Sequence, residues 1–492
     1  MLKSRWKKVL LVLAIIPALV IIGIILLLNF SGTQPQKIES IPAGELGKKY
    51  PPEELRADLD YLFSTFEEVH PNLYAFTSKE KVAAEIEAVK QAFDQPATRA
   101  DLYQEVAPLV AMLGDGHTYM HAPSEELEQA LEQGLAVFPL SLNIERGRAF
   151  IENTEVQQEI GVTAGSELVS INDKRVEEII SSFMDFISGE KDSFKEKILE
   201  NHFSHLLWLV YDFKDSFEIK VKYHQSGQTE IMVIDGIKEE KITSRDRSEE
   251  FYTFEIIPEV NAGYIDFRGF VDMEAFEIFL EETFTELDQK AISHLVIDIR
   301  DNGGGNSRLG DAFLKYLTGE PFNQFKAIDL KVSEQIMDRY GPGGLFLHLQ
   351  ALAAGEIVRK GEILELPTKK TEPGENPLLY EGEVYLLVSP YTFSSAASFA
   401  AAIKYYDLGT LIGEETGGLI TTFGDVYRFA LPNTRLQAGV SHKRFISHGG
   451  EENGKTGVKP DFEVTTTPED LARGRDPFLD FTRELIRSGD KN

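Results

Sequence analysis

The sequence predicts an α/β protein whose core is a mostly parallel sheet, and three features support this fold class. Stretches at 291–300, 384–388 and 408–412 are rich in apolar residues and are predicted to be buried strands. Helical patterns follow the first two, at 307–317 and from about 395 to 405. Glycine-rich or serine-rich turns separate these strands from their helices. Strands that alternate with helices favour parallel order, because the helix carries the chain back across the sheet.

Length and composition limit the classes of function. The chain has 492 residues, 42% hydrophobic and 26% charged, as expected for a folded protein of two or three units. A formal net charge of −30 argues against nucleic-acid partners, since phosphate contacts need a basic surface. The absence of cysteine excludes disulfides, cysteine nucleophiles and thiolate metal sites. No other residue cluster has metal-ligand spacing, so we expect no metal and no cofactor.

The first thirty residues predict a membrane anchor. Four basic residues between positions 3 and 8 precede an uninterrupted apolar run at 9–28, long enough to span the hydrocarbon core as a helix. The basic flank should stay in the cytoplasm, which places the chain after Phe30 on the far side. A cleaved signal peptide is the alternative, but 29–32 has no convincing cleavage site. We therefore expect a single-pass protein of the cell membrane with an extracytoplasmic catalytic part.

Changes of pattern along the chain set the domain boundaries. We expect the anchor at 1–30, a polar linker at 31–50, a helical lead-in at 51–135, a β-rich insertion at 136–237 and the α/β domain at 250–480. The lead-in has apolar residues at helical spacing at 52–69, 79–93 and 99–113. Residues 321–379 show no pattern that identifies an element.

The insertion resembles a PDZ-like peptide-binding domain. Its predicted strands at 140–144, 149–151 and 165–172, followed by a helix after Arg175, resemble the strand, turn and helix of such a domain. Residues 182–211 are expected to be a helical insertion within it. PDZ-like domains add an extended peptide to a sheet edge and often hold its C-terminal carboxylate. The usual carboxylate-binding loop is not evident before residue 140, and an unrelated β-rich unit is the alternative.

The strongest chemical signal is the segment 389–399 (SPYTFSSAASF), which follows a buried strand and opens a helix. This arrangement exposes a hydroxyl at the end of the strand, as nucleophilic serines are exposed in other α/β enzymes. Free amide groups at the helix start also suit a developing oxyanion. Ser394 and the adjacent Ser395 are both candidate nucleophiles. Taken alone, a serine at this position is more often a helix N-cap.

Two further segments carry catalytic residue types. The glycine run at 303–305 would let backbone amides approach a substrate carbonyl, although alone it would indicate only a tight turn. His117, between Gly116 and Thr118, has the side chain of a general base, although a lone histidine is more often structural. Neither segment is sufficient evidence by itself.

Taken together, five ordered phrases resemble the tail-specific (C-terminal processing) protease family. They are LGDGHT at 113–118, VIDIRDNGGG at 296–305, TFSSA at 392–396, GEETGG at 413–418 and GVKPD at 457–461. The resemblance covers nearly the whole chain after Pro51. It implies a crotonase-like (ClpP-like) αββ core, with the lead-in as the N-terminal part of the protease domain and the PDZ-like unit inserted after the first phrase. It also implies serine endopeptidase activity on polypeptides, commonly on extended or C-terminal segments, through an acyl-enzyme.

The family has two catalytic variants, and this sequence favours one. The first uses a lysine just after the Gly-Glu-x-Thr phrase, where this chain has Leu419, and no lysine lies between Lys404 and Lys443. The second, as in the tricorn core protease and its chlamydial relative, pairs serine with histidine. That resemblance implies Ser394 as nucleophile and His117 as general base.

The resemblance also implies supporting residues. A glutamate before the last phrase would polarise the histidine through water, with Glu452 preferred and Glu451 as the alternative. The oxyanion hole would use the amide of Ser395 and that of Gly303 or Gly304. Ser394 is preferred to Ser395 because Phe399 then matches the aromatic position of the family. His70 belongs to a phrase common in the family and is interpreted as structural.

Other functions share these residues. A catalytically silent member would serve as a peptide-binding scaffold, and an esterase would use the same acyl chemistry. The PDZ-like unit favours polypeptide substrates over small esters. The expected partners are therefore polypeptide segments and the membrane, through the N-terminal helix. The sequence leaves the oligomeric state open.

Overall fold

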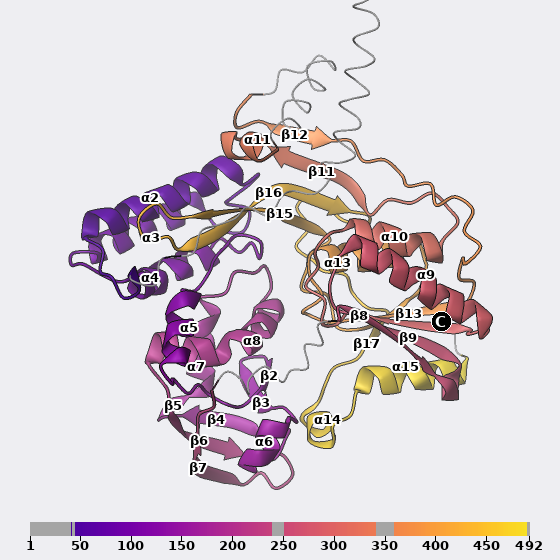
Figure 1. The fold of residues 1–492 in the computed structure, drawn as a ribbon, viewed down its shortest axis with the longest axis horizontal. Coiled ribbons are helices and arrows are strands. Elements are labelled where there is room, and N and C mark those ends of the chain that lie inside the picture. The colour runs from indigo at the N-terminus through magenta and orange to yellow at the C-terminus, as the bar shows by residue number, and fades with distance from the viewer. Residues whose placement is uncertain (1–40, 42–44, 239–249, 341–358, 490–492) are drawn as a thin grey trace, which may run out of the picture.

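The computed structural model describes residues 41, 45–238, 250–340 and 359–489, which form three sheets and their covering helices (Figure 1). The predicted anchor at 1–30 lies outside these residues. Within them, no helix is both long and apolar enough to cross a membrane. The described part of the predicted linker is already folded, because Ile41 and Tyr50 are buried and Tyr50 exchanges backbone hydrogen bonds with Ala97.

Three helices form the lead-in, which confirms the helical pattern of the sequence. They are α2 (Pro52–Val69), α3 (Lys79–Ala92) and α4 (Arg99–Ala111). Proline at the first position of α2 is compatible with helix, since the first turn needs no amide donor. The side chains of Ser78 and Thr98 cap α3 and α4 by accepting hydrogen bonds from amides of the first turn.

The inserted unit is an antiparallel sheet with helices packed on it. The strands run in the order β2 (Leu142–Glu145), β3 (Arg148–Ile151), β4 (Glu167–Ile171), β6 (Ser216–Lys222) and β7 (Thr229–Asp235), with β5 (Lys174–Arg175) paired to β4. The helices in and just before the unit are α5 (Ser124–Glu132), α6 (Glu155–Ile160), α7 (Val176–Met184) and α8 (Asp192–Tyr211). The predicted strands therefore form within about two residues of their expected positions. Helix α7 is the helix expected after Arg175, and α8 lies within the helical insertion expected at 182–211. The unit shares one hydrophobic core with the lead-in.

The third part is the predicted α/β core. Its sheet has the order β17 (Phe462–Glu463), β14 (Thr410–Gly413), β13 (Glu383–Val388), β10 (His294–Asp298), β9 (Ala262–Phe267) and β8 (Tyr252–Ile257). All neighbours are parallel except β8 and β9. One face packs on α9 (Met273–Gln289), α10 (Arg308–Leu317) and α13 (Ser395–Tyr405), and the other on α15 (Pro477–Ser488). Burial on both faces explains why the central strands are rich in apolar residues.

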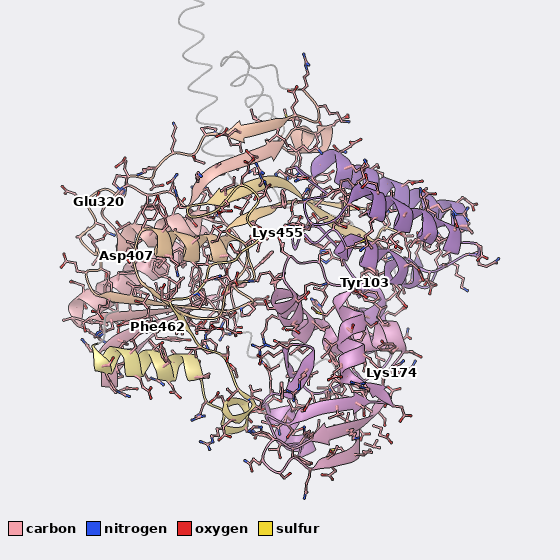
Figure 2. The ribbon with its side chains drawn as sticks, turned by 180° about the vertical axis from the view of Figure 1, so that it is seen from behind. Tyr103, Lys174, Glu320, Asp407, Lys455 and Phe462 are labelled. Atoms are coloured by element: carbon pink, nitrogen blue, oxygen red, sulfur yellow. The ribbon has the colours of Figure 1, made fainter. Side chains whose placement is uncertain are left out.

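A second antiparallel sheet joins the core to the lead-in, as Figure 1 shows. Its strands are β1 (Tyr119–Met120), β16 (Gln437–Ser447), β11 (Phe325–Lys331) and β12 (Ile363–Leu366), with β15 (Thr421–Ala430) on the other side of β16. The short elements are α11 (Glu334–Tyr340), η3 (Pro258–Val260) and α14 (Pro468–Arg473). The stretch that the sequence left unassigned, 321–379, therefore contributes β11, α11 and β12. Seen from behind, Tyr103 marks the lead-in, Lys174 the inserted unit and Phe462 the core (Figure 2).

A buried carboxylate fixes the lead-in to the joining sheet, and its loss should destabilise the fold. Asp58 of α2 is fully buried and accepts four hydrogen bonds from Asn433 and Thr434, between β15 and β16. We expect Asp58→Ala to lower the free energy of unfolding by about 3 kcal/mol, because buried donors lose their acceptor. Asp60→Ala is the control: its exposed carboxylate pairs with Lys90 at 2.6 Å, so it should cost under about 1 kcal/mol. Urea denaturation measures both, and equal losses would contradict this account.

Candidate active site

The turn that carries Ser394 is bonded to the loop that follows the neighbouring strand. Between β13 and α13, the hydroxyls of Ser389 and Thr392 donate to the carbonyls of Arg300 and Ile299 at 2.6 and 2.8 Å. The amide of Phe393 donates to the carbonyl of Asn302 at 3.1 Å. Because β10 and β13 are parallel neighbours, these two loops both begin at the carboxyl ends of their strands, on the same side of the sheet. The second and third sequence phrases therefore meet in space.

Ser394 has a strained backbone and a hydroxyl that faces a histidine. Its φ of 53° and ψ of −125° lie outside the ordinary regions for a residue with a side chain. The serine precedes α13, yet its side chain caps no amide of that helix. Instead, Oγ lies 2.9 Å from Nε2 of His117, a residue 277 positions earlier in the chain. A serine hydroxyl within hydrogen-bond reach of an imidazole is the geometry of an activated nucleophile.

Ser395 has a different environment. Its hydroxyl is buried and donates to the carbonyl of Gly305 at 2.6 Å. This hydrogen bond holds the start of α13 against the glycine run. Of the two adjacent serines, Ser394 is thus the one that the fold presents to a base.

The glycine run lies directly against the nucleophile. Gly304 has φ of +98°, and a Cβ there would lie 2.7 Å from Cβ of Ser394 and 2.9 Å from the amide nitrogen of Ser395. Only a residue without a side chain fits this close approach. The amide of Gly304 already donates to Oδ1 of Asn302 at 2.8 Å. Of the two glycine alternatives for the oxyanion hole, Gly303 is therefore the one whose amide is not used by Asn302.

The loop that carries His117 is organised by Asp115. Oδ1 of Asp115 accepts the amide of His117 at 3.0 Å, and Oδ2 accepts the hydroxyls of Thr118 and Ser441 at 2.5 and 2.7 Å. His70 lies 3.0 Å from the same oxygen. Because Nδ1 of His70 accepts the amide of Asn72, its proton is on Nε2 and is donated to Asp115. The structural role expected for His70 is therefore to bind Asp115.

The electrostatics of the loop suit a general base. Burial alone would raise the pKa of Asp115, but the hydrogen bonds from His70 and Thr118 bring it well below its usual range. Burial lowers the pKa of His117 below its ordinary value, although the charges of Asp115 and Asp425 oppose this. His117 is consequently neutral at neutral pH, which leaves Nε2 able to accept the proton of Ser394.

The other expected positions are less close to this pair. Among the described residues, the buried Nδ1 of His117 has no hydrogen-bond partner, and Oδ1 of Asp115 lies 4.0 Å away. Glu452 is 73% exposed and pairs with Arg444 at 3.6 Å. Glu451 accepts the hydroxyl of Thr421 through its main-chain carbonyl. Neither glutamate contacts His117 directly, so the third catalytic residue stays a prediction.

The lysine variant finds no support in this geometry. Leu419 occupies the place expected for that lysine and is buried, with its backbone bridged to Gly457. The preceding Gly418 lies against the nucleophile, because a Cβ there would be 2.9 Å from the amide nitrogen of Ser394. Residues 413–418 therefore pack against the turn of Ser394, and Leu419, which follows them, cannot act as a base.

Comparison with known proteins agrees with this geometry. Residues 261–464 match the model of Peptidase family S41. We call this matched segment, residues 261–464, the S41 domain. A protein of Sulfurisphaera tokodaii, named as a tricorn-like protease C-terminal subunit, is 38% identical over 108 residues, which is 21% of this chain. That match spans 12% of the length of the relative, well under two thirds of it.

Solved structures share the fold over most of the chain. Mature CPAF complexed with lactacystin is similar with a TM-score of 0.65 and 13% identity, over 89% of this chain and 99% of that one. Mature CPAF alone gives the same TM-score and identity over 90% of this chain. The resemblance to tail-specific serine proteases is confirmed, and the S41 domain contains Ser394, the glycine run and Leu419. His117 lies outside the matched residues, and the folding of the chain brings its side chain next to Ser394 of the S41 domain.

Several contributors could not be found in the sequence. Asp115 stands within the first phrase, but its partner Ser441 is 326 residues away. Phe393 stacks on the ring of His117, with centroids 4.6 Å apart. Asn302 is buried and positions Gly304. The only sequence signal for these residues is that three of them lie inside the quoted phrases.

Substitution at Gly304 tests the close approach of the glycine run. We expect Gly304→Ala to slow covalent labelling of Ser394 by a fluorophosphonate reagent about 100-fold, because the new Cβ displaces the nucleophile and the Ser395 amide. Gly361→Ala is the matched control, since Gly361 has φ of +89° and open space around its Cβ position. In both variants the free energy of unfolding should fall by about 1 kcal/mol, because alanine is strained in the left-handed backbone conformation. Equal labelling of the two variants would contradict the proposed packing.

Proposed function

We propose that the chain is a serine endopeptidase that cleaves polypeptides through an acyl-enzyme, with Ser394 as nucleophile and His117 as general base. The observation that carries this proposal is the 2.9 Å separation of Ser394 Oγ and His117 Nε2 across 277 residues of sequence. It argues against a catalytically silent scaffold, for which this pairing would have no use.

The proposed reaction follows from the contacts of the two residues. Oγ of Ser394 attacks the scissile carbonyl carbon while Nε2 of His117 takes the hydroxyl proton. The amides of Ser395 and Gly303 would bind the oxyanion. When the intermediate collapses, the carbon–nitrogen bond breaks and His117 gives its proton to the leaving amine. Water then attacks the acyl ester, with His117 again as base. The bond between the acyl carbon and Oγ breaks, His117 returns the proton to Oγ, and the new carboxyl end leaves.

We also infer that the core is crotonase-like and that the inserted unit is PDZ-like, with polypeptide segments as the ligand. An antiparallel sheet packed on α7 and α8 supports the second inference. Glu196 and Glu200 of α8 accept hydrogen bonds from amides at β2 and the turn after it. A peptide that adds to this edge must displace these carboxylates. We further propose an extracytoplasmic, membrane-anchored location, supported by the apolar run at 9–28.

Cleavage of an unfolded protein by the full-length chain in detergent tests the proposed activity. We expect casein to be cleaved, with a loss of about 1,000-fold or more in Ser394→Ala and His117→Ala, because acyl transfer needs both groups. Leu419→Met should cleave as the unaltered chain does, since that position supplies no base. Casein cleavage by Ser394→Ala would overturn the proposal, and activity restricted to small esters would favour the esterase alternative.

A further inference from the structure

A carboxyl group from the inserted unit lies against the catalytic loop without a part in the chemistry above. Glu190 stands between α7 and α8 and is half-buried as a residue. Both of its carboxyl oxygens are buried, and among the described residues no hydrogen bond of ordinary geometry reaches them, although the amides of Gly116 and Glu190 lie nearby. Oε2 lies 3.1 Å from the point where a Cβ on Gly116 would be. Buried polar atoms without partners cost free energy, so a fold that keeps one beside its base needs a reason.

The same loop brings an aromatic stack to the catalytic histidine. Phe194, in the first turn of α8, stacks on Phe393 with ring centroids 4.2 Å apart and an interplanar angle of 14°. Phe393 stacks in turn on His117, at 4.6 Å and 26°. A Cβ on Gly116 would lie 2.7 Å from Phe393 and 3.2 Å from Phe194. The missing side chain at Gly116 thus makes room for Glu190 and both phenylalanines.

Two contacts hold this loop on the S41 domain. Nζ of Lys191 pairs with Oε1 of Glu415 at 2.8 Å and donates to the carbonyl of Thr416 at 3.3 Å. Gly417 lies close enough to Phe194 that a Cβ there would be 2.8 Å from it. The segment 413–418 therefore contacts the turn of Ser394 on one side and the segment that contains Glu190 on the other.

The charges around Glu190 keep it protonated. Asp115 faces it from the catalytic loop, and two carboxylates in one buried site cannot both ionise without a large cost. Burial, and then the charge of Asp115, raises the pKa of Glu190 to about 8, against the opposing effect of nearby amides. Asp115 keeps the negative charge because its own pKa is held low by the hydrogen bonds from His70 and Thr118.

The cations on the same element do not neutralise Glu190. Lys191 is paired with Glu415. Burial lowers the pKa of Lys195, and the charges that oppose this come from Asp192 and Asp185. At neutral pH, the group beside Gly116 is consequently an uncharged acid.

We propose that Glu190 is a positioning residue for the catalytic histidine: as an uncharged acid it fills the space beside Gly116 and, with Phe194, holds Phe393 against the ring of His117. This rests on the proposed function, in which His117 is the base. Ionised Glu190 would place a second negative charge beside Asp115 and separate the two loops. The site then loses its geometry at alkaline pH.

The first test measures folding and does not depend on catalysis. Unfolded, Glu190 loses its proton near the ordinary value of 4.5, whereas folded it keeps the proton to about 8. Folding must take up a proton between these values, so stability falls as pH rises through this window. In a Ser394→Ala background, Glu190→Gln should raise the Tm by a few degrees at neutral pH and by nothing below pH 4.5. Glu178→Gln, exposed on α7, is the control and should show no pH-dependent gain.

The second test measures the pH profile of Ser394 labelling by a fluorophosphonate. The unaltered chain should lose labelling above about pH 8, and Glu190→Gln should keep it, because the amide cannot ionise. Profiles that coincide, or a Tm gain independent of pH, would overturn the role of Glu190. Absence of labelling at every pH would instead overturn the proposed function, while the Tm series would still show whether Glu190 is protonated in the folded chain.

Discussion

The site depends on one buried carboxylate, that of Asp115. It binds the amide of His117, the hydroxyls of Thr118 and Ser441, and the ring of His70. These donors come from the end of α2, from the loop of His117 and from β16, so one anion joins three segments that are distant in sequence. A carboxylate with several donors stays ionised when buried. It therefore supplies a fixed negative charge near His117 and fixes the backbone from which that side chain extends.

Ser394, the proposed nucleophile, is positioned by a different principle, which is close backbone packing at the ends of parallel strands. Glycine at 304 and 418 lets two loops touch the turn of Ser394 without intervening side chains. The hydroxyls of Ser389 and Thr392 bond that turn to the loop after β10. These contacts keep the backbone of Ser394 in its strained conformation, and the packing of the surrounding core offsets the free energy of that strain. His117 and Ser394 are thus positioned by two independent sets of contacts, and their side chains meet at 2.9 Å.

The sequence predicted local features well and long-range partners poorly. Helices of the lead-in and the alternation of β10, α10, β13 and α13 follow from apolar periodicity, which reports each segment's own burial. The β15–β16 hairpin and β11 are stabilised by pairing with each other, and residues 321–379 carry no local sign of this. Ser394 and His117 were recognisable only through a family resemblance. Glu190 could not be predicted, since a glutamate in a loop normally indicates solvent exposure.

The most direct test of the central claim is the pH dependence of Ser394 acylation by an uncharged sulfonyl fluoride. The account predicts that the rate rises through one ionisation below the ordinary histidine value of 6.5 and then stays level up to about pH 8, where Glu190 ionises, because burial lowers the pKa of His117 and the neutral ring is the base. His117→Gln should remove that ionisation and slow the reaction about 100-fold or more. If the ionisation persists in His117→Gln, or lies near the pKa of a lysine, a different group activates Ser394 and the account is wrong.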